Sequence, residues 1–108
     1  MTDGAVNPAV YVLAPMALLA APLFEEAVFR GLYFRRLLAG VGAVPAFVAS
    51  SIAFAAIHGN PTGVPIYLLQ GVIFAGVYRY TGRLSAAVAV HFLNNLITLV
   101  LLLSGAGN

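Results

Sequence analysis

Long runs of apolar residues, interrupted by short clusters of glycine, proline and arginine, divide the chain into four segments. They run from about Pro8 to Leu38, from Pro45 to His58, from Pro65 to Tyr80 and from Leu84 to Leu103. We expect all four to be helices within a membrane, because an isolated strand cannot satisfy its backbone hydrogen bonds in lipid. The pattern therefore predicts an all-α fold, a polytopic transmembrane bundle of about four helices that forms a single domain over residues 1–108.

The first two segments have lengths that do not fit a simple membrane span. The first exceeds the roughly 20 residues that cross the hydrocarbon, and it contains Pro15 and Pro22. We therefore expect a kink or break just before Glu25. The second is short and is followed by the run 59–65, which is rich in helix breakers. A helix that stops short of the far face, with an irregular loop after it, is typical of functional sites in membrane proteins.

Three pairs of small residues at four-residue spacing predict where the helices approach one another. They are Ala46 and Ser50, Ala49 and Ala53, and Gly71 and Ala75. Side chains of this size let two helix backbones come close together in a membrane.

The composition excludes an ordinary soluble domain. Hydrophobic residues make up 62% of the chain and charged residues 7%, against roughly 25% charged residues in soluble domains. A soluble chain of 108 residues would need many more polar side chains to cover its large relative surface. We therefore expect a multi-pass protein in a lipid bilayer. Its bias toward alanine, valine, glycine and arginine, without lysine, is typical of GC-rich prokaryotic genomes and predicts an inner or plasma membrane.

The basic residues are few and lie at the ends of segments. A nucleic-acid-binding protein would gather them on one solvated face, so we expect no nucleic-acid partner. Arg35 and Arg36 precede the second helix, and Arg79 and Arg83 precede the fourth. With four spans these connections share a face, which the positive-inside rule makes cytoplasmic. Asp3 and the uncharged C-terminal tail are then expected at the opposite face.

The remaining polar residues are predicted to meet near the middle of the bilayer. Counting ~1.5 Å per residue from the arginine-bearing face, Glu25 and Glu26 lie roughly 15 Å deep. On the same count His91 lies ~12 Å deep, Asn95 ~18 Å and His58 ~20 Å. Ionisable side chains at such depth are costly to bury, so they commonly serve a function.

Glu25 and Glu26 are two of the three acidic residues in the chain. Glu26 precedes Arg30 by four residues, which is the favourable order for a helical ion pair. Glu25 points about 100° away from Glu26 and has no opposite charge nearby in sequence. A structural ion pair plus one carboxylate that reaches water would account for these residues, but adjacent carboxylates within a span are hard to explain by packing. The chain has no cysteine, so no thiolate competes for a catalytic role.

The two histidines also admit a structural and a functional interpretation. His58 lies four residues after Phe54 at a predicted helix C-terminus, where an imidazole often complements the helix dipole. His91 precedes Asn95 by four residues, and such a pair can hydrogen-bond across helices. With the carboxylates, however, these side chains predict a hydrolase site, because a carboxylate and imidazoles can deprotonate water directly or through Zn²⁺. An imidazole and a carboxamide can also donate hydrogen bonds to a developing oxyanion.

Three motifs at these positions occur in order along the chain. They are Glu-Glu-x-x-x-Arg from Glu25 to Arg30, Phe-x-x-x-His from Phe54 to His58, and His-x-x-x-Asn from His91 to Asn95. Each is weak alone, but the three in this order on membrane helices are specific. The sequence resembles the CPBP family of intramembrane proteases, which includes CAAX prenyl endopeptidases of the Rce1 type and bacterial Abi proteins. The resemblance covers roughly residues 14–103.

The resemblance implies a role for each motif residue. Glu25 would activate the attacking water, and His58 would hold that water or a metal. His91 and Asn95 would stabilise the tetrahedral oxyanion. Glu26 would organise the site together with Arg30, and Phe54 would support it.

The resemblance also implies a reaction, but it leaves the use of a metal open. Members of the family have been described both as metal-dependent and as glutamate-dependent proteases. A metalloprotease-like site with Zn²⁺ held by Glu25, His58 and His91 and a metal-free site are therefore both possible. The expected substrate is a peptide or protein, cut in CAAX-type C-terminal processing or in bacteriocin maturation or immunity.

One feature of the chain departs from the family pattern, and other functions remain as alternatives. Members of the family usually carry further spans before this core, whereas this chain has four at most. A trimmed domain, a minimal member or a bundle completed by a homo-oligomer would each account for that difference. The alternatives to a protease are a catalytically inactive immunity or partner-binding protein of the same fold and, less favoured, a proton-coupled transport subunit with a Glu and His relay. Transport fits less well, because a proton relay needs no oxyanion donors.

Overall fold

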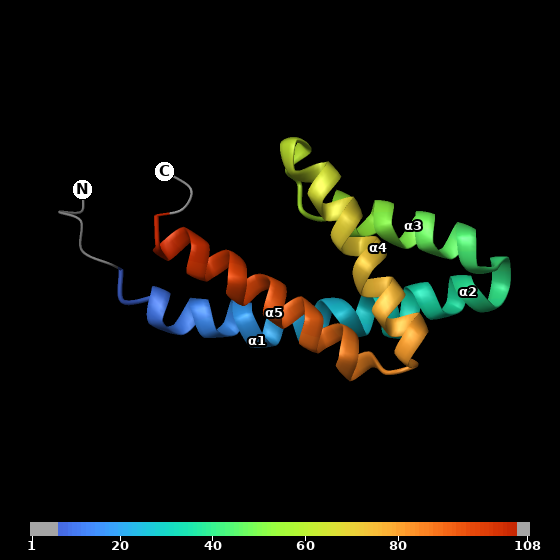
Figure 1. The fold of residues 1–108 in the computed structure, drawn as a ribbon, viewed down its shortest axis with the longest axis horizontal. Coiled ribbons are helices and arrows are strands. Elements are labelled where there is room, and N and C mark those ends of the chain that lie inside the picture. Colours follow the sequence, from blue (N-terminus) through green and yellow to red (C-terminus); the bar gives the residue numbers. More distant parts are fainter. Residues whose placement is uncertain (1–6, 106–108) are drawn as a thin grey trace.

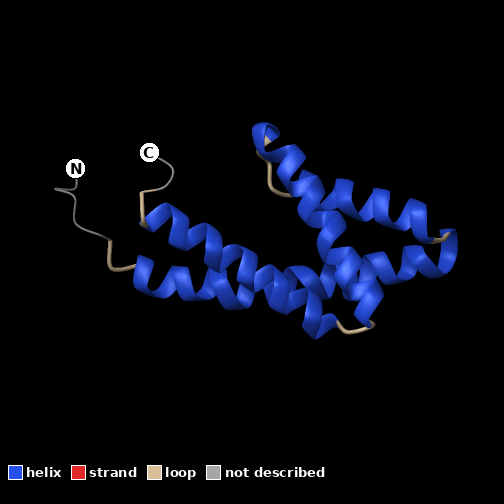
Figure 2. Cartoon of the chain, in the orientation of Figure 1, coloured by secondary structure: helices blue, strands red, loops and turns tan. Residues whose placement is uncertain are grey.

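The computed structural model describes residues 7–105, and over this range the chain consists of helices and short turns without a strand (Figure 2). The elements are α1 (Val10–Val28), the π-helical segment η1 (Phe29–Phe34), α2 (Arg35–Val41), α3 (Ala43–Ala56), the 3₁₀ turn η2 (Pro61–Gly63), α4 (Val64–Thr81) and α5 (Leu84–Leu103). Because α1, η1 and α2 follow one another without a break, the described chain has four helical segments. The predicted all-α fold is confirmed.

The first helical segment continues through both prolines, so of the kink or break predicted just before Glu25 the break is wrong. Pro15 and Pro22 both lie inside α1, which stays α-helical as far as Val28. A proline removes one backbone hydrogen bond and crowds the preceding turn. Breaking the helix would leave further backbone groups without partners, which lipid cannot supply.

The irregularity in this segment lies after the two glutamates instead of before them. Residues 29–34 form a π-helical turn, in which backbone bonds reach one residue further than in an α-helix. Positions four apart drift by about 40° around a regular α-helix. The extra residue in the π turn offsets this drift, and Glu26, Arg30 and Phe34 are all buried on one face.

Three of the four helical segments are long and apolar enough to cross a membrane, namely Val10–Val41, Pro61–Thr81 and Leu84–Leu103. The fourth, α3, has 14 residues and a length of about 21 Å at 1.5 Å per residue. It is therefore shorter than the ~30 Å hydrocarbon core. The prediction that the second helix stops short of the far face agrees with this length.

The bundle is elongated, with extents of 54 × 27 × 21 Å, and neighbouring helices run antiparallel to one another. In Figure 1, α1 lies beside α5, and α3 folds back over α2 and contacts α4. Of the three pairs of small residues predicted to let helices approach, Ala46 with Ser50 and Gly71 with Ala75 are buried, whereas Ala49 and Ala53 are half-buried. At Gly71 helices α3 and α4 are so close that an added Cβ would lie 3.0 Å from the Cα of Ser51.

The connections between helices set the orientation of the bundle. The α2–α3 and α4–α5 connections lie toward one end of the long axis, and the start of α1 and the end of α5 lie at the other (Figure 1). This arrangement agrees with the prediction that the arginine-bearing connections share a face. The α3–α4 connection lies part-way along the axis. Asp3 and the last three residues, which were predicted to occupy the opposite face, are outside the described residues.

Candidate active site

A buried ion pair anchors the site on the first helical segment. Arg30 Nη1 lies 3.2 Å from Glu26 Oε2, and both side chains are fully buried. The pairing predicted from their spacing is therefore confirmed. Arg30 Nη2 donates a hydrogen bond of 2.6 Å to the carbonyl oxygen of Gly71 in α4. The guanidinium also lies over the rings of Phe54 and Phe74, at 4.8 and 5.6 Å from their centroids. Arg30 thus fixes Glu26 and ties η1 to α3 and α4.

His91 of α5 joins the two adjacent carboxylates. Its Nδ1 lies 2.7 Å from Glu26 Oε2, and its Nε2 lies 3.4 Å from Glu25 Oε1. The imidazole is stacked on Phe74, with the ring centroids 4.5 Å apart. The side chain of His91 is 5% exposed and that of Glu25 is 28% exposed. The fold therefore makes one continuous chain of contacts, Arg30 to Glu26 to His91 to Glu25, between residues far apart in sequence.

The Nδ1 of His91 carries a hydrogen in this arrangement, because the carboxylate of Glu26 only accepts hydrogen bonds. The charge of Glu26 is compensated by Arg30, which matters because an uncompensated charge in an apolar interior is strongly destabilising.

Two polar atoms of the buried pair, Glu26 Oε1 and Arg30 Nε, have no hydrogen-bond partner within residues 7–105. Such atoms are uncommon in native proteins, and each requires an explanation. The buried pair therefore keeps hydrogen-bonding capacity that the described part of the chain does not use.

His58 approaches the same cluster from the C-terminal end of α3. Its Nδ1 lies 2.7 Å from the carbonyl oxygen of Phe54. A carbonyl only accepts, so Nδ1 carries the hydrogen and the neutral ring keeps a lone pair on Nε2. The imidazole is stacked on Tyr67 at 3.9 Å between centroids. The ring of Phe54 contacts both histidines, with centroids 4.9 Å from His58 and 5.9 Å from His91.

Asn95 lies one helical turn beyond His91 on α5. Its side chain makes no hydrogen bond within the described part of the chain, and it lines a hollow of about 240 Å³ with residues such as Leu18 and Leu102. The structure therefore places Asn95 next to the cluster along the helix but does not bring it into contact with the carboxylates.

The predicted zinc ligands do not gather around one point. A tetrahedral zinc site uses three or four protein ligands about one ion. Within residues 7–105 no group of three His, Asp or Glu side chains lies close enough to hold a metal. Glu25 and His91 meet, whereas His58 is held at Phe54 and Tyr67. The donor set in this arrangement does not fit Zn²⁺.

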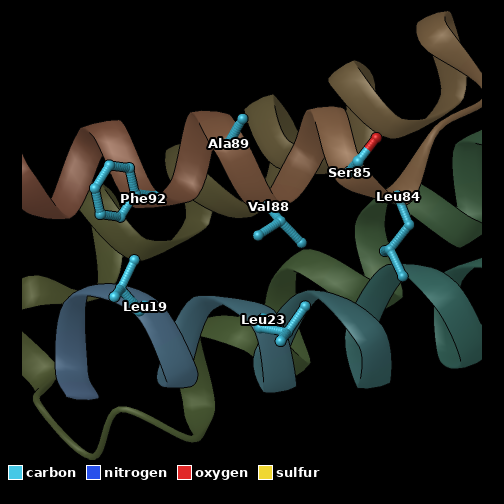
Figure 3. A pocket seen from close by; sticks show the side chains of 7 residues that line it. All are labelled: Leu19, Leu23, Leu84, Ser85, Val88, Ala89 and Phe92. Atoms are coloured by element: carbon cyan, nitrogen blue, oxygen red, sulfur yellow. The ribbon is translucent and has the colours of Figure 1, made fainter. Parts of the chain in front are cut away.

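An apolar groove of about 470 Å³ runs between α1 and α5 (Figure 3). Leu19 and Leu23 line it from α1, and Val88 and Phe92 line it from α5. Leu23 and Phe92 are close in sequence to Glu25 and His91, so the groove follows the same helix pair as the candidate site. None of its lining residues is charged.

Three contacts of the site have no direct signal in the sequence. Gly71 is recognisable as a small residue, but its role as a carbonyl acceptor for Arg30 depends on a backbone atom that has no sequence signature. The stacking of Phe74 on His91 and of Tyr67 on His58 depends on how α4 packs against its neighbours. Aromatic residues in an apolar helix are too common to single these two out.

Comparison with known proteins places the chain in a family. The family model described as type II CAAX prenyl endopeptidase Rce1-like matches residues 7–97. The chain belongs to the Rce1-like family. The resemblance drawn from the three motifs is thereby confirmed, and the multi-pass location in a cell membrane agrees with it.

Two bacterial relatives are similar to this member of the Rce1-like family. The "Membrane-embedded CAAX protease MroQ" of Staphylococcus aureus (strain USA300) is 36% identical over 80 residues, which cover 68% of this chain and 32% of the relative. The "Putative membrane peptidase YdiL" of Bacillus subtilis (strain 168) is 25% identical over 103 residues, which cover 95% of this chain and 42% of the relative. The chain thus matches less than half the length of each. No solved structure matches it.

Proposed function

We propose that this chain is the catalytic core of an intramembrane endopeptidase, which hydrolyses a peptide bond with a water activated by Glu25. The observation that carries the proposal is the chain of contacts from Arg30 through Glu26 and His91 to Glu25 inside an apolar bundle. A buried carboxylate beside an imidazole is a typical pair for general acid–base catalysis. The family and the printed names of both relatives support the same reaction.

In the proposed reaction Glu25 takes a proton from water, and the resulting hydroxide attacks the carbonyl carbon of the scissile bond. His58 accepts a hydrogen bond from the same water through its Nε2 lone pair. The Nε2–H of His91 turns from Glu25 to the tetrahedral oxyanion, and Asn95 is the second donor. When the C–N bond breaks, the protonated Glu25 transfers its proton to the leaving amine, so that atoms and charges balance.

Glu26 and Arg30 act in this proposal by positioning the groups that react. Glu26 accepts from Nδ1 of His91 and so directs Nε2 toward the reaction. Arg30 compensates the charge of Glu26, and its rigid planar guanidinium holds the carboxylate in place. Removing either residue would leave the other as an uncompensated buried charge, which typically destabilises a protein by roughly 3–5 kcal/mol.

The water is held by protein side chains in this proposal, because the three candidate zinc ligands are not gathered in the structure. Cleavage should therefore survive a strong chelator. Loss of cleavage with the chelator and its return with Zn²⁺ would instead establish the metalloprotease-like site.

The proposed substrate is a membrane-associated peptide or protein, and the family name favours a prenylated CAAX C-terminus. Processing of a bacteriocin precursor is the other substrate class. A fluorogenic peptide library with and without the prenyl group distinguishes the two.

The test is peptide cleavage by purified protein in nanodiscs. Glu25→Gln should lower the rate by about 10²–10⁴-fold, the usual contribution of a general base. Asn95→Ala should lower it by about 10²–10³-fold, as for other oxyanion donors. The neighbouring Asn94→Ala is the matched control and should stay close to wild type. Unchanged cleavage in Glu25→Gln would refute the assigned base.

The second candidate is a catalytically inactive partner-binding member of the same fold. One observation favours it: the three apolar hollows described for this bundle are lined by neither Glu25 nor His91. An immunity assay with Glu25→Ala separates the candidates, because undiminished protection by this variant would mean that catalysis is not the function.

A further inference from the structure

A second groove runs along the opposite side of the first helical segment, between η1–α2 and α3, with a volume of about 680 Å³. Phe29, Leu32 and Leu37 line it from the long helix, and Ala53 lines it from α3. Its one charged lining residue is Arg36. Gly40 also lies in its wall, and a Cβ added there would meet no atom within 4 Å. The groove is therefore apolar, open and marked by a single cation.

The groove lies in the membrane, so something apolar fills it. A gap beside a packed surface loses dispersion contacts, and the lipid chains around the bundle remove that loss by entering it. Such contacts do not select one lipid from another, because acyl chains are as apolar as leucine. A preference for one lipid headgroup must therefore come from a charged side chain, and Arg36 is the charged side chain that lines the groove.

Arg36 has the position and the freedom to select a headgroup. It is exposed and forms no ion pair with any residue between 7 and 105. It belongs to the arginine-bearing end of the bundle, which the positive-inside rule places at the cytoplasmic leaflet. Anionic phospholipids give that leaflet its negative surface potential. The charge of Arg36 is therefore complementary to the lipid headgroups at its own depth.

A second copy of this chain is a poorer occupant. The chain has three acidic residues. Glu25 and Glu26 belong to the buried cluster, and Asp3 precedes the first helix. A second copy therefore offers no carboxylate at the depth of Arg36, and its helix would leave that cation without a partner.

We propose that this groove binds one anionic phospholipid, with its phosphate on Arg36 and an acyl chain along Leu32 and Phe29. The deep end of the acyl chain then lies against Phe29. The ring of Phe29 packs edge to face on Phe54 of the candidate active site, at 5.6 Å between centroids. The proposal concerns binding and stands apart from the proposed protease activity, so that failure of one leaves the other intact.

The test is native mass spectrometry of the delipidated full chain, supplied with phosphatidylglycerol and phosphatidylcholine of equal chain length. The wild type should retain one phosphatidylglycerol in preference to phosphatidylcholine. Arg36→Gln should reduce that preference by at least about fivefold, the factor for one arginine near an anionic surface, and by clearly more than Arg35→Gln does. Arg35→Gln is the matched control, since it removes the same charge from an exposed neighbour outside the groove. Ala53→Leu should displace the acyl chain by filling the groove from α3.

Three results would overturn the proposal. Equal losses in Arg35→Gln and Arg36→Gln would mean a diffuse surface attraction without a site. Undiminished binding in Ala53→Leu would mean that the acyl chain lies elsewhere. A dimer or a bound polypeptide in place of the lipid would mean that another partner covers the groove. Circular dichroism of each variant confirms that the helices are intact before binding is compared.

Discussion

A single methyl group at Gly71 should loosen the candidate active site without altering any of its side chains. The carbonyl of Gly71 accepts the 2.6 Å hydrogen bond from Arg30. A Cβ added at Gly71 would lie 3.0 Å from the Cα of Ser51 and 3.2 Å from its Cβ and Oγ. Because the nearest atom belongs to the backbone, the contact cannot be relieved by a side-chain rotation. Gly71→Ala should therefore push α3 and α4 apart by a few tenths of an ångström.

The expected loss of folding stability follows from two destabilising effects and one stabilising effect. Overpacking a close helix contact costs about 1–3 kcal/mol. Displacing the carbonyl weakens a hydrogen bond to a charged group, which contributes about 1.5–3 kcal/mol when intact. Alanine returns up to ~1 kcal/mol through its higher helix propensity. We expect Gly71→Ala to lower the free energy of unfolding by about 1–3 kcal/mol.

Gly76→Ala is the matched control on the same helix. Its added Cβ would meet only Phe47 Cε1, at 4.0 Å, which is an ordinary van der Waals distance. This variant should be neutral or slightly stabilising, since it gains helix propensity of up to ~1 kcal/mol without a clash. The two substitutions are chemically identical, so their difference isolates the helix contact.

The assay combines unfolding in detergent with ¹⁵N NMR of histidine-labelled protein. The chain has two histidines, so the imidazole region contains two spin systems. Glu26 fixes the tautomer of His91, and Arg30 fixes Glu26. Gly71→Ala should therefore shift the His91 nitrogens and leave those of His58 in place, while Gly76→Ala shifts neither. Unchanged His91 signals with unchanged stability would refute the reasoning, and equal effects from Gly76→Ala would show that the contact at Gly71 is not special.

Three further substitutions test separate parts of the structure. Arg30→Lys should lower the melting temperature, because one ammonium cannot replace the rigid fork that reaches a carboxylate and a carbonyl together; a melting temperature equal to wild type would contradict this. Gly82→Ala should destabilise by about 1 kcal/mol, since the residue caps α4 with a positive φ of 68° that alanine adopts poorly; Gly40→Ala, which needs no such φ, is its control in the same unfolding measurement. Tyr67→Leu should shift the NMR signals of His58, and no shift would mean that the observed stacking does not persist in the membrane.

The sequence predicted those parts of the fold and site that depend on local spacing. The four helical segments and the shortness of α3 follow from the apolar runs and the breakers between them. The Glu26–Arg30 pair follows from a four-residue separation on one helix. Close contacts through Gly71 and other small residues follow from their spacing as well.

The contacts that the sequence did not predict depend on three-dimensional packing. No helix break occurs before Glu25, because helix continuity in lipid outweighs one hydrogen bond lost at a proline. The π turn at residues 29–34 has no sequence signal of its own. The acceptor for Arg30 is a backbone oxygen, and no residue type signals that. The bridging of both carboxylates by His91 requires α5 to lie against α1 in one register. The meeting of Glu25, Glu26 and His91 could be predicted, but the atoms through which His91 contacts the two carboxylates could not.

The measurement that tests the central claim most directly is a single turnover in ¹⁸O-labelled water, followed by mass spectrometry of the product and of the protein. If Glu25 acts as a base on water, the label enters the new carboxyl group of the product, and the Glu25 side chain stays unlabelled. Label found in Glu25 would identify it as a nucleophile. No cleavage by folded wild-type protein, with any peptide of the library, would contradict the protease assignment itself.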